Sequence, residues 1–149
     1  MLMDVGRPEI IETSGSRNLR YRGRFLYSER GPAFAAERAA AACEIGPDRL
    51  YLVASPGLWY GVPELLARLG RGSALLCVEA DPELAELERR ELPEAVRNDS
   101  RFSFLEIRDS SSILAAARGL GSFRRCVSLR LSGGEAFHGT SAHLRDTIL

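Results

Sequence analysis

The feature that most constrains the fold is the regular alternation of short apolar runs with helical segments from residue 50 onward. Residues 50–54 read Leu-Tyr-Leu-Val-Ala, a continuous apolar run that is typical of a strand covered on both faces. A helix over 62–69 follows and is closed by glycines. The same order then recurs, with strands predicted over 74–78, 102–107 and 126–131 and helices over 82–92, 110–118 and 141–149. This alternation predicts an α/β fold with a parallel sheet and right-handed crossovers.

Upstream, residues 9–27 read as two extended stretches around a turn at Gly15, which predicts a β-hairpin. By the period of two, the second arm has an apolar face and a charged face. The apolar face holds Leu19, Tyr21, Phe25 and Tyr27, and the charged face holds Arg20, Arg22 and Arg24. The charged face is either a solvated outer surface or a site for an anion or a protein partner.

We therefore expect residues 1–30 to form an N-terminal β-hairpin extension and residues 31–149 a Rossmann-like domain of about four strands with flanking helices. Gly31-Pro32 begins the first helix of that domain, which runs to about Cys43. A complete doubly wound sheet has about six strands, so we expect the N-terminal part of a longer protein. Its downstream domain is then an expected partner, and an exposed sheet edge favours a homodimer.

Composition excludes several classes of function. All twenty basic residues are arginine, which rules out mechanisms that need a Schiff-base lysine or a P-loop lysine. Twenty acidic residues balance them, so we expect neither nucleic acid nor a membrane surface as a partner. No apolar run approaches the ~20 residues of a membrane span. Cys43, Cys77 and Cys126 lie in apolar or small-residue runs, which predicts buried, reduced thiols and a cytoplasmic location.

In a Rossmann-like sheet, ligands bind beyond the carboxyl ends of the strands, where several loops of this chain would meet. Residues 55–61 precede a helix, where backbone N–H groups can hold an anion. Glu79 follows Gly57 by about 20 residues, the spacing of the acid that binds ribose hydroxyls in dinucleotide folds. Asp109, after the third strand, could accept from an adenine amino group, and residues 132–135 form the last loop. The candidate cofactor-binding residues are Ser55, Gly57, Trp59, Gly61, Glu79, Asp81 and Asp109, and the candidate cofactor is S-adenosylmethionine or a nucleotide.

The same residues also have a purely structural interpretation. Against the pattern Gly-x-Gly-x-x-Gly, the loop keeps Gly57 but has Ser55 at the first position, and Gly61 falls one place late. The glycines would then serve turns, Trp59 would fill the crevice, and Asp81 would cap the next helix. Both interpretations stay open from the sequence.

Other polar groups are assigned to the surface or to caps. The acidic residues of 83–94, together with Arg89 and Arg90, are expected on the solvated face of a helix. The buried stripe of that helix is expected to hold Leu84, Leu87 and Leu92. His138 and His143 lack a pattern of neighbouring ligands, so no metal site is predicted. No catalytic residue is predicted either.

Three stretches together resemble a known family. These are Leu26-Tyr27-Ser28 with Gly31-Pro32 and Ala36-Glu37-Arg38, then Gly57-Leu58-Trp59-Tyr60-Gly61, and then Val78-Glu79-Ala80-Asp81-Pro82. They resemble the N-terminal Rossmann-like region of motility-associated factor proteins, the flagellin-glycosylation group related to archaeal 6-hydroxymethylpterin diphosphokinases. The resemblance covers about residues 10–87, and class I methyltransferases share the general form of the last two motifs. The chain departs from the family at Ser55 and Trp59, where the family usually has glycine, and at Tyr27, where it commonly has histidine.

The resemblance implies an accessory Rossmann-like domain with no independent catalysis, upstream of a catalytic transferase domain. One alternative is an S-adenosylmethionine-dependent methyltransferase, in which residues 55–61 face the methionine part, Glu79 the ribose and Asp109 the adenine. Another is a protein-interaction module that uses the arginine face of the hairpin.

Overall fold

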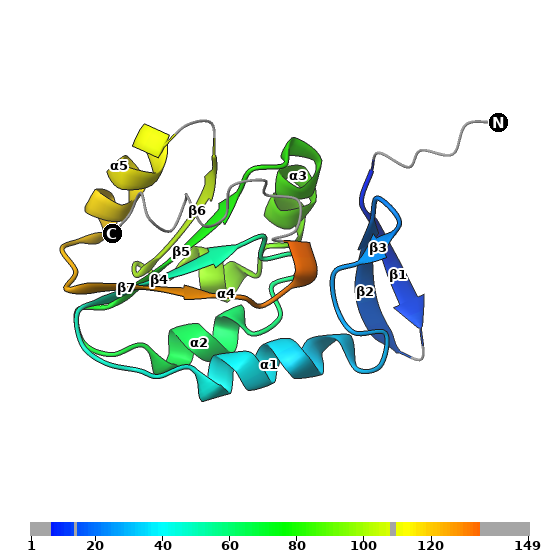
Figure 1. Cartoon of the computed structure of the whole chain (residues 1–149), viewed down its shortest axis with the longest axis horizontal. Coiled ribbons are helices and arrows are strands. Elements are labelled where there is room, and N and C mark those ends of the chain that lie inside the picture. The colour runs from blue at the N-terminus through cyan, green and yellow to red at the C-terminus, as the bar shows by residue number, and fades with distance from the viewer. Residues whose placement is uncertain (1–6, 14, 108–109, 135–149) are drawn as a thin grey trace.

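The computed structural model describes residues 7–13, 15–107 and 110–134, which form two sheets with flanking helices (Figure 1). The larger sheet has four parallel strands in the order β6-β5-β4-β7. In register, Leu50 of β4 lies opposite Ala74 of β5 and Cys126 of β7. The strands are β4 (Arg49–Ala54), β5 (Ala74–Glu79), β6 (Phe102–Glu106) and β7 (Arg125–Leu129). The predicted α/β fold with a parallel sheet is therefore confirmed.

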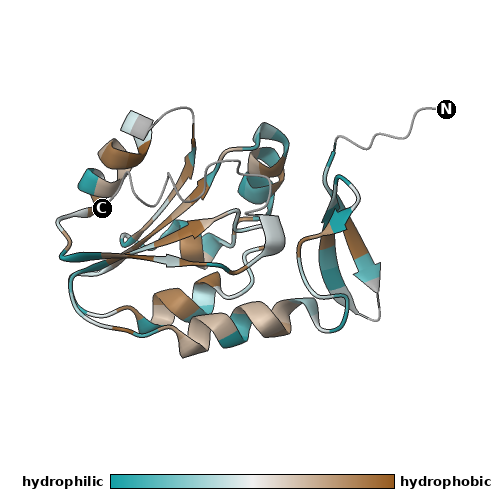
Figure 2. Cartoon of the chain, in the orientation of Figure 1, coloured by the Kyte–Doolittle hydropathy of each residue, from teal (hydrophilic) through white to brown (hydrophobic). Residues whose placement is uncertain are grey.

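Helices cover both faces of this sheet, which explains why its central strands are continuously apolar (Figures 1 and 2). Tyr51 and Val53 of β4 pack into one apolar cluster with α1, α2 and α3, whereas Leu50 and Leu52 pack into a second cluster with Ile113 of α5. The helices are α1 (Pro32–Ala42), α2 (Val62–Arg68), α3 (Pro82–Glu91), α4 (Glu94–Arg97) and α5 (Ser110–Leu120). No helix within the described residues has the length and apolar character that a membrane span requires.

The N-terminal sheet is antiparallel, and it has a third strand beyond the predicted hairpin. Its strands are β1 (Glu9–Thr13), β2 (Ser16–Tyr21) and β3 (Arg24–Phe25). The third strand arises because Arg22 and Gly23 turn the chain back with φ values of 52° and 75°. This turn interrupts the period of two, so Phe25 is 37% exposed and Leu26 is buried instead. The prediction that Phe25 belongs to the apolar face was wrong for this reason.

The N-terminal sheet and the α/β part share one core. Leu19 and Leu26 belong to the same apolar cluster as Trp59 and Leu65. Backbone contacts add to this packing, since Gly133 N donates to Leu26 O at 2.6 Å.

The three cysteines are free thiols, but their burial differs. Cys77 is fully buried, whereas Cys43 and Cys126 are only half-buried because they lie near the ends of α1 and β7. The prediction of three buried thiols therefore holds only for Cys77. The predicted helix over 141–149 and the two histidines lie outside the described residues.

Candidate functional site

Residues 55–61 connect the carboxyl end of β4 to α2, which is where the sheet order reverses next to β4. Ser55, Gly57, Trp59 and Gly61 all have positive φ values, of 55°, 60°, 69° and 87°. A Cβ at Gly57 would lie 2.5 Å from Tyr27 Oη, and a Cβ at Gly61 would lie 2.7 Å from Ala36 O. Both glycines are therefore required by protein groups that pack closely against the loop.

The N–H groups of this loop have acceptors inside the protein. Gly57 N donates to Glu88 Oε2 at 2.8 Å, and Leu58 N donates to Tyr27 Oη at 2.9 Å. The Tyr27 hydroxyl in turn donates to Pro56 O at 2.9 Å. The donors that could hold an anion at a helix start are thus occupied by a tyrosine and a glutamate.

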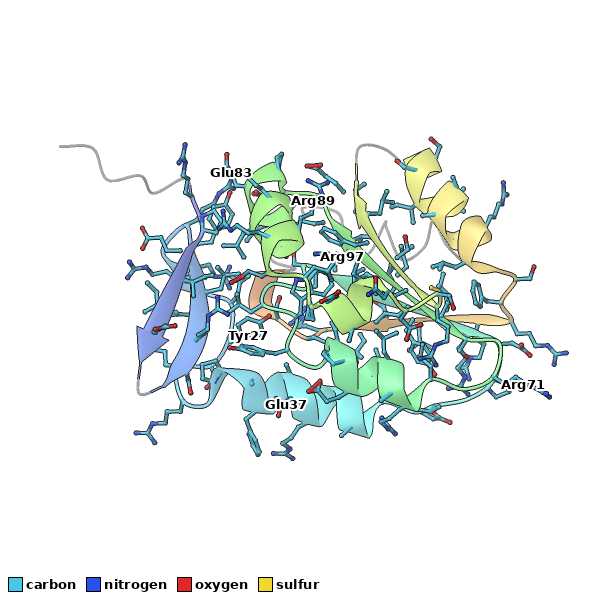
Figure 3. All side chains as sticks on the ribbon, turned by 180° about the vertical axis from the view of Figure 1, so that it is seen from behind. Tyr27, Glu37, Arg71, Glu83, Arg89 and Arg97 are labelled. Carbon is cyan, nitrogen blue, oxygen red and sulfur yellow. The ribbon has the colours of Figure 1, made fainter. Side chains whose placement is uncertain are left out.

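The segment after β3 positions Tyr27, and a buried asparagine holds that segment. Asn18 of β2 donates from Nδ2 to Tyr27 O at 3.1 Å, and its Oδ1 accepts from Tyr27 N at 3.3 Å. Figure 3 shows Tyr27 where the N-terminal sheet meets the α/β part. Burial raises the pKa of Tyr27 far above its usual value, so its hydroxyl keeps its proton. The N-terminal sheet therefore supplies the side chain that closes the loop.

Glu79 lies at the carboxyl end of β5 and is 0% exposed. Ser55 Oγ donates to Glu79 Oε1 at 2.8 Å, and Asp81 N donates to Glu79 Oε2 at 3.1 Å. The structure therefore brings together Ser55, Gly57 and Glu79 as the sequence predicted. A ligand ribose could reach the Glu79 carboxylate only after the loop had moved.

Glu88 completes this cluster, although it was expected on the solvated face of its helix. It is 0% exposed, and its backbone O accepts from Trp59 Nε1 at 2.8 Å. Burial is the largest cause that raises the pKa of Glu88 well above its usual value, and the Glu79 carboxyl adds to it. The helical spacing contains a signal for this burial, because Glu88 lies four residues from both Leu84 and Leu92 in the predicted stripe.

Asp81 has a structural role at the start of α3. Its Oδ1 accepts from Glu83 N at 2.9 Å and from Leu84 N at 3.2 Å, which confirms the predicted helix cap. It also accepts from Tyr21 Oη at 2.9 Å, and Arg22 Nη2 lies 3.3 Å from Oδ2. Asp81 therefore joins α3 to the N-terminal sheet.

The side chain of Trp59 packs into the apolar core. Trp59 is 1% exposed and packs edge-on against Phe102 at 5.7 Å and Phe104 at 5.3 Å between ring centroids. Its indole fills the core beside β6. Asp109 lies outside the described residues. The predicted loop after β7 does join the site, since Ser132 Oγ donates to Ser55 O at 2.6 Å.

A hollow of about 200 Å³ lies next to Tyr27, between α1 and the end of β7. Its lining is mostly apolar, and Arg130 is the one charged residue among the described residues that line it. The lining includes Tyr27 and Ser132 but neither Gly57 nor Glu79. This hollow therefore does not open onto the carboxyl groups.

Comparison with known proteins gives one informative similarity. The chain is 29% identical over 130 residues to an uncharacterized protein of Treponema pallidum (strain Nichols). The match covers 87% of this chain and 23% of that protein, so the chain spans less than a quarter of the relative's length. No protein-family profile matches the chain. No solved structure matches it.

Proposed function

We propose that this chain is an accessory Rossmann-like domain of a longer, motility-associated factor type of protein, and that it performs no catalysis itself. One observation carries the proposal. The loop groups that would bind a ligand already have partners within the protein, since Gly57 N bonds to Glu88 and Leu58 N bonds to Tyr27. The domain then contributes to the fold and the contacts of a larger protein.

Two further observations support this proposal. The relative in Treponema is much longer than the matched segment, so a homologous region occurs there within a larger polypeptide. The rest of such a polypeptide is the partner we propose first, and a second copy of this chain is an alternative. The three free thiols support the cytoplasmic location that we propose.

Calorimetric titration tests the proposal. We expect no binding heat with S-adenosylhomocysteine or with nucleotide sugars, because the loop and the N-terminal sheet occupy the crevice. Micromolar binding that disappears in Glu79→Gln would contradict the proposal, provided that Glu83→Gln on the exposed side of α3 still binds.

The second candidate is an S-adenosylmethionine-dependent or nucleotide-binding domain. The strand order favours it, because the reversal next to β4 places residues 55–61 where such folds bind ligands. A ligand would have to displace the Tyr27 hydroxyl from Leu58 N. In this case Tyr27→Ala should bind S-adenosylhomocysteine more tightly than the wild type. The absence of binding heat from both proteins rejects this candidate.

The arginine face of the N-terminal sheet remains a third candidate, as a protein-interaction surface. Arg20 Nη2 lies 3.0 Å from Glu9 Oε2, and Arg22 pairs with Asp81. Internal pairing thus involves two of the three predicted guanidinium groups, which leaves Arg24 as the best test position. Capture of a partner that survives Arg24→Glu unchanged would remove this candidate.

A further inference from the structure

Another hollow, of about 290 Å³, lies at the opposite end of the parallel sheet from residues 55–61. Its lining includes Leu50 and Cys126, which face each other in register at the amino ends of β4 and β7. The end of α5 and the chain that connects α5 to β7 form its wall (Figure 1). This volume is near the lower end of the ~300–1,000 Å³ that ligand pockets usually have. The hollow is therefore separate from the candidate site described above.

One side of α5 borders this hollow. The lining residues from α5 and the turn after it are Leu114, Ala117, Arg118 and Gly121. Offsets of three, four and seven residues place these positions on the same side of a helix. Leu114 is half-buried there, whereas Arg118 is exposed. This side of α5 therefore presents an apolar surface next to a guanidinium group.

The floor of the hollow is apolar and only partly covered. Leu50 is buried at its base, and Phe123 and Cys126 beside it are half-buried. Burial raises the pKa of the Cys126 thiol, so this group stays neutral. The floor therefore offers apolar contact to a ligand and carries no charge.

The rim of the hollow is cationic. Arg118, Arg124 and Arg125 line it, and no acidic residue is among the described residues that do so. The nearest described carboxylate partner is Asp48, whose Oδ2 lies 3.9 Å from Arg124 Nε. The guanidinium groups of Arg118 and Arg125 have no ion pair with the described part of the chain. An anion at the rim would reduce the repulsion among these like charges.

We propose that this hollow binds a small organic anion, in which a carboxylate or phosphate group is joined to a compact apolar group. The apolar group covers Phe123 and Cys126, and the anionic group lies against the guanidinium groups of the rim. Arginine binds carboxylates and phosphates alike through paired N–H donors, so the negative head group is the shared chemistry. Nucleotide sugars lack this combination, because hydrophilic sugars flank their phosphates.

Titrations with phenylacetate and with phenyl phosphate, followed by amide NMR spectra, test the site. At least one of the two probes should bind with a Kd below about 1 mM, and the better probe identifies the head group. The amide signals of Gly121 and Cys126 should shift, whereas that of Gly57 should not. Acetate, inorganic phosphate and benzyl alcohol each carry half of the chemistry, so they should bind about tenfold more weakly.

Three results of these titrations overturn the proposal. The first is the absence of shifts with both aromatic probes. The second is equally tight binding of inorganic phosphate, which would mean an adventitious ion only. The third is a set of shifts centred on Gly57 instead of Gly121.

Variants of the rim test which charges hold the anion. Arg118→Gln should weaken the binding of the better probe about tenfold, and Arg124→Gln should weaken it as well. Both side chains are exposed, so both variants should fold. The matched control is Arg97→Gln in α4, which packs against the other face of the sheet (Figure 3) and should bind like the wild type. Unchanged affinity in both rim variants overturns the proposal.

This site and the proposed accessory role can fail independently. Glu79→Gln should leave the binding of the aromatic anions unchanged, because Glu79 ends β5 at the opposite end of the sheet. Loss of that binding in Glu79→Gln would place the anion in the wrong part of the molecule and overturn the assignment.

Discussion

The Glu88 carboxyl occupies a position that helical spacing assigns to the core, four residues after the buried Leu84 of α3. Its raised pKa makes folding sensitive to pH with a defined sign. An unfolded glutamate ionises near pH 4.3, whereas the folded Glu88 holds its proton to higher pH. Unfolding therefore releases a proton in the interval between the two pKa values, and stability falls as pH rises through it.

We predict that Glu88→Gln removes this fall in stability. Between the unfolded and the folded pKa of Glu88, the free energy of unfolding of the wild type should decrease relative to Glu88→Gln by up to about 1.4 kcal/mol for each pH unit. Urea denaturation of both proteins at several pH values measures the difference. Glu83→Gln should keep the slope of the wild type, and parallel curves for the wild type and Glu88→Gln would contradict the prediction.

Gly57 provides a second residue-scale prediction, because a close contact and a positive φ coincide there. Gly57→Ala should lower the free energy of unfolding by about 2–4 kcal/mol, since the new Cβ would meet Tyr27 Oη and the backbone is strained as well. Gly23→Ala is the matched control, because its φ is similar at 75° but nothing lies within 4 Å of its Cβ. It should cost only about 1 kcal/mol. Equal losses in both variants would show that Tyr27 does not restrict this position.

At the scale of the element, the start of α3 combines a helix cap with a contact to the N-terminal sheet. Asp81→Ala should lower the free energy of unfolding by about 2–3 kcal/mol, because both the cap and the acceptor of the buried Tyr21 hydroxyl are lost. Tyr21→Phe removes only the second contact and should cost about 1 kcal/mol. The exposed ion pair between Arg22 and Asp81 is lost as well but is worth little, so the difference between the two variants in thermal denaturation measures mainly the contribution of the cap. Equal losses would mean that the cap contributes little.

The elements that the sequence predicted well are those set by local rules. The apolar run at residues 50–54, Pro82 at a helix start and the Asp81 cap each depend on neighbours in the chain, and the structure has all of them. The turn at Arg22 and Gly23 was missed because its residues continue an alternating pattern that suits a longer strand.

The internal partners of the candidate site depend on tertiary packing and not on local rules. Tyr27 and Glu88 lie far from residues 55–61 in the sequence, and only tertiary packing brings them to Leu58 N and Gly57 N. The sequence thus predicted that Ser55, Gly57 and Glu79 meet, but it did not reveal which groups of the protein form hydrogen bonds with them. The spacing of Glu88 from Leu84 is the one local signal that the Glu88 side chain is buried.

At the scale of the whole molecule, the N-terminal sheet and the α/β part should unfold as one cooperative unit. Leu19 and Leu26 share an apolar cluster with Trp59 and Leu65, so neither part keeps its core without the other. Leu19→Ala should therefore lower the free energy of unfolding by about 2–4 kcal/mol. The unfolding midpoints measured by Trp59 fluorescence and by far-ultraviolet circular dichroism should fall together. Exposed Phe34→Ala is the control that should change neither midpoint. Two separate transitions would contradict a shared core.

The position of Tyr27 in the chain has a consequence for biosynthesis. Because a polypeptide emerges from the ribosome from its N-terminus, the segment that carries Asn18 and Tyr27 leaves the exit tunnel before β4 and the loop that follows it. The closing hydroxyl is thus already present when Leu58 N first needs an acceptor. The nascent domain can therefore form this loop without leaving the Leu58 N–H exposed and free to bind other molecules.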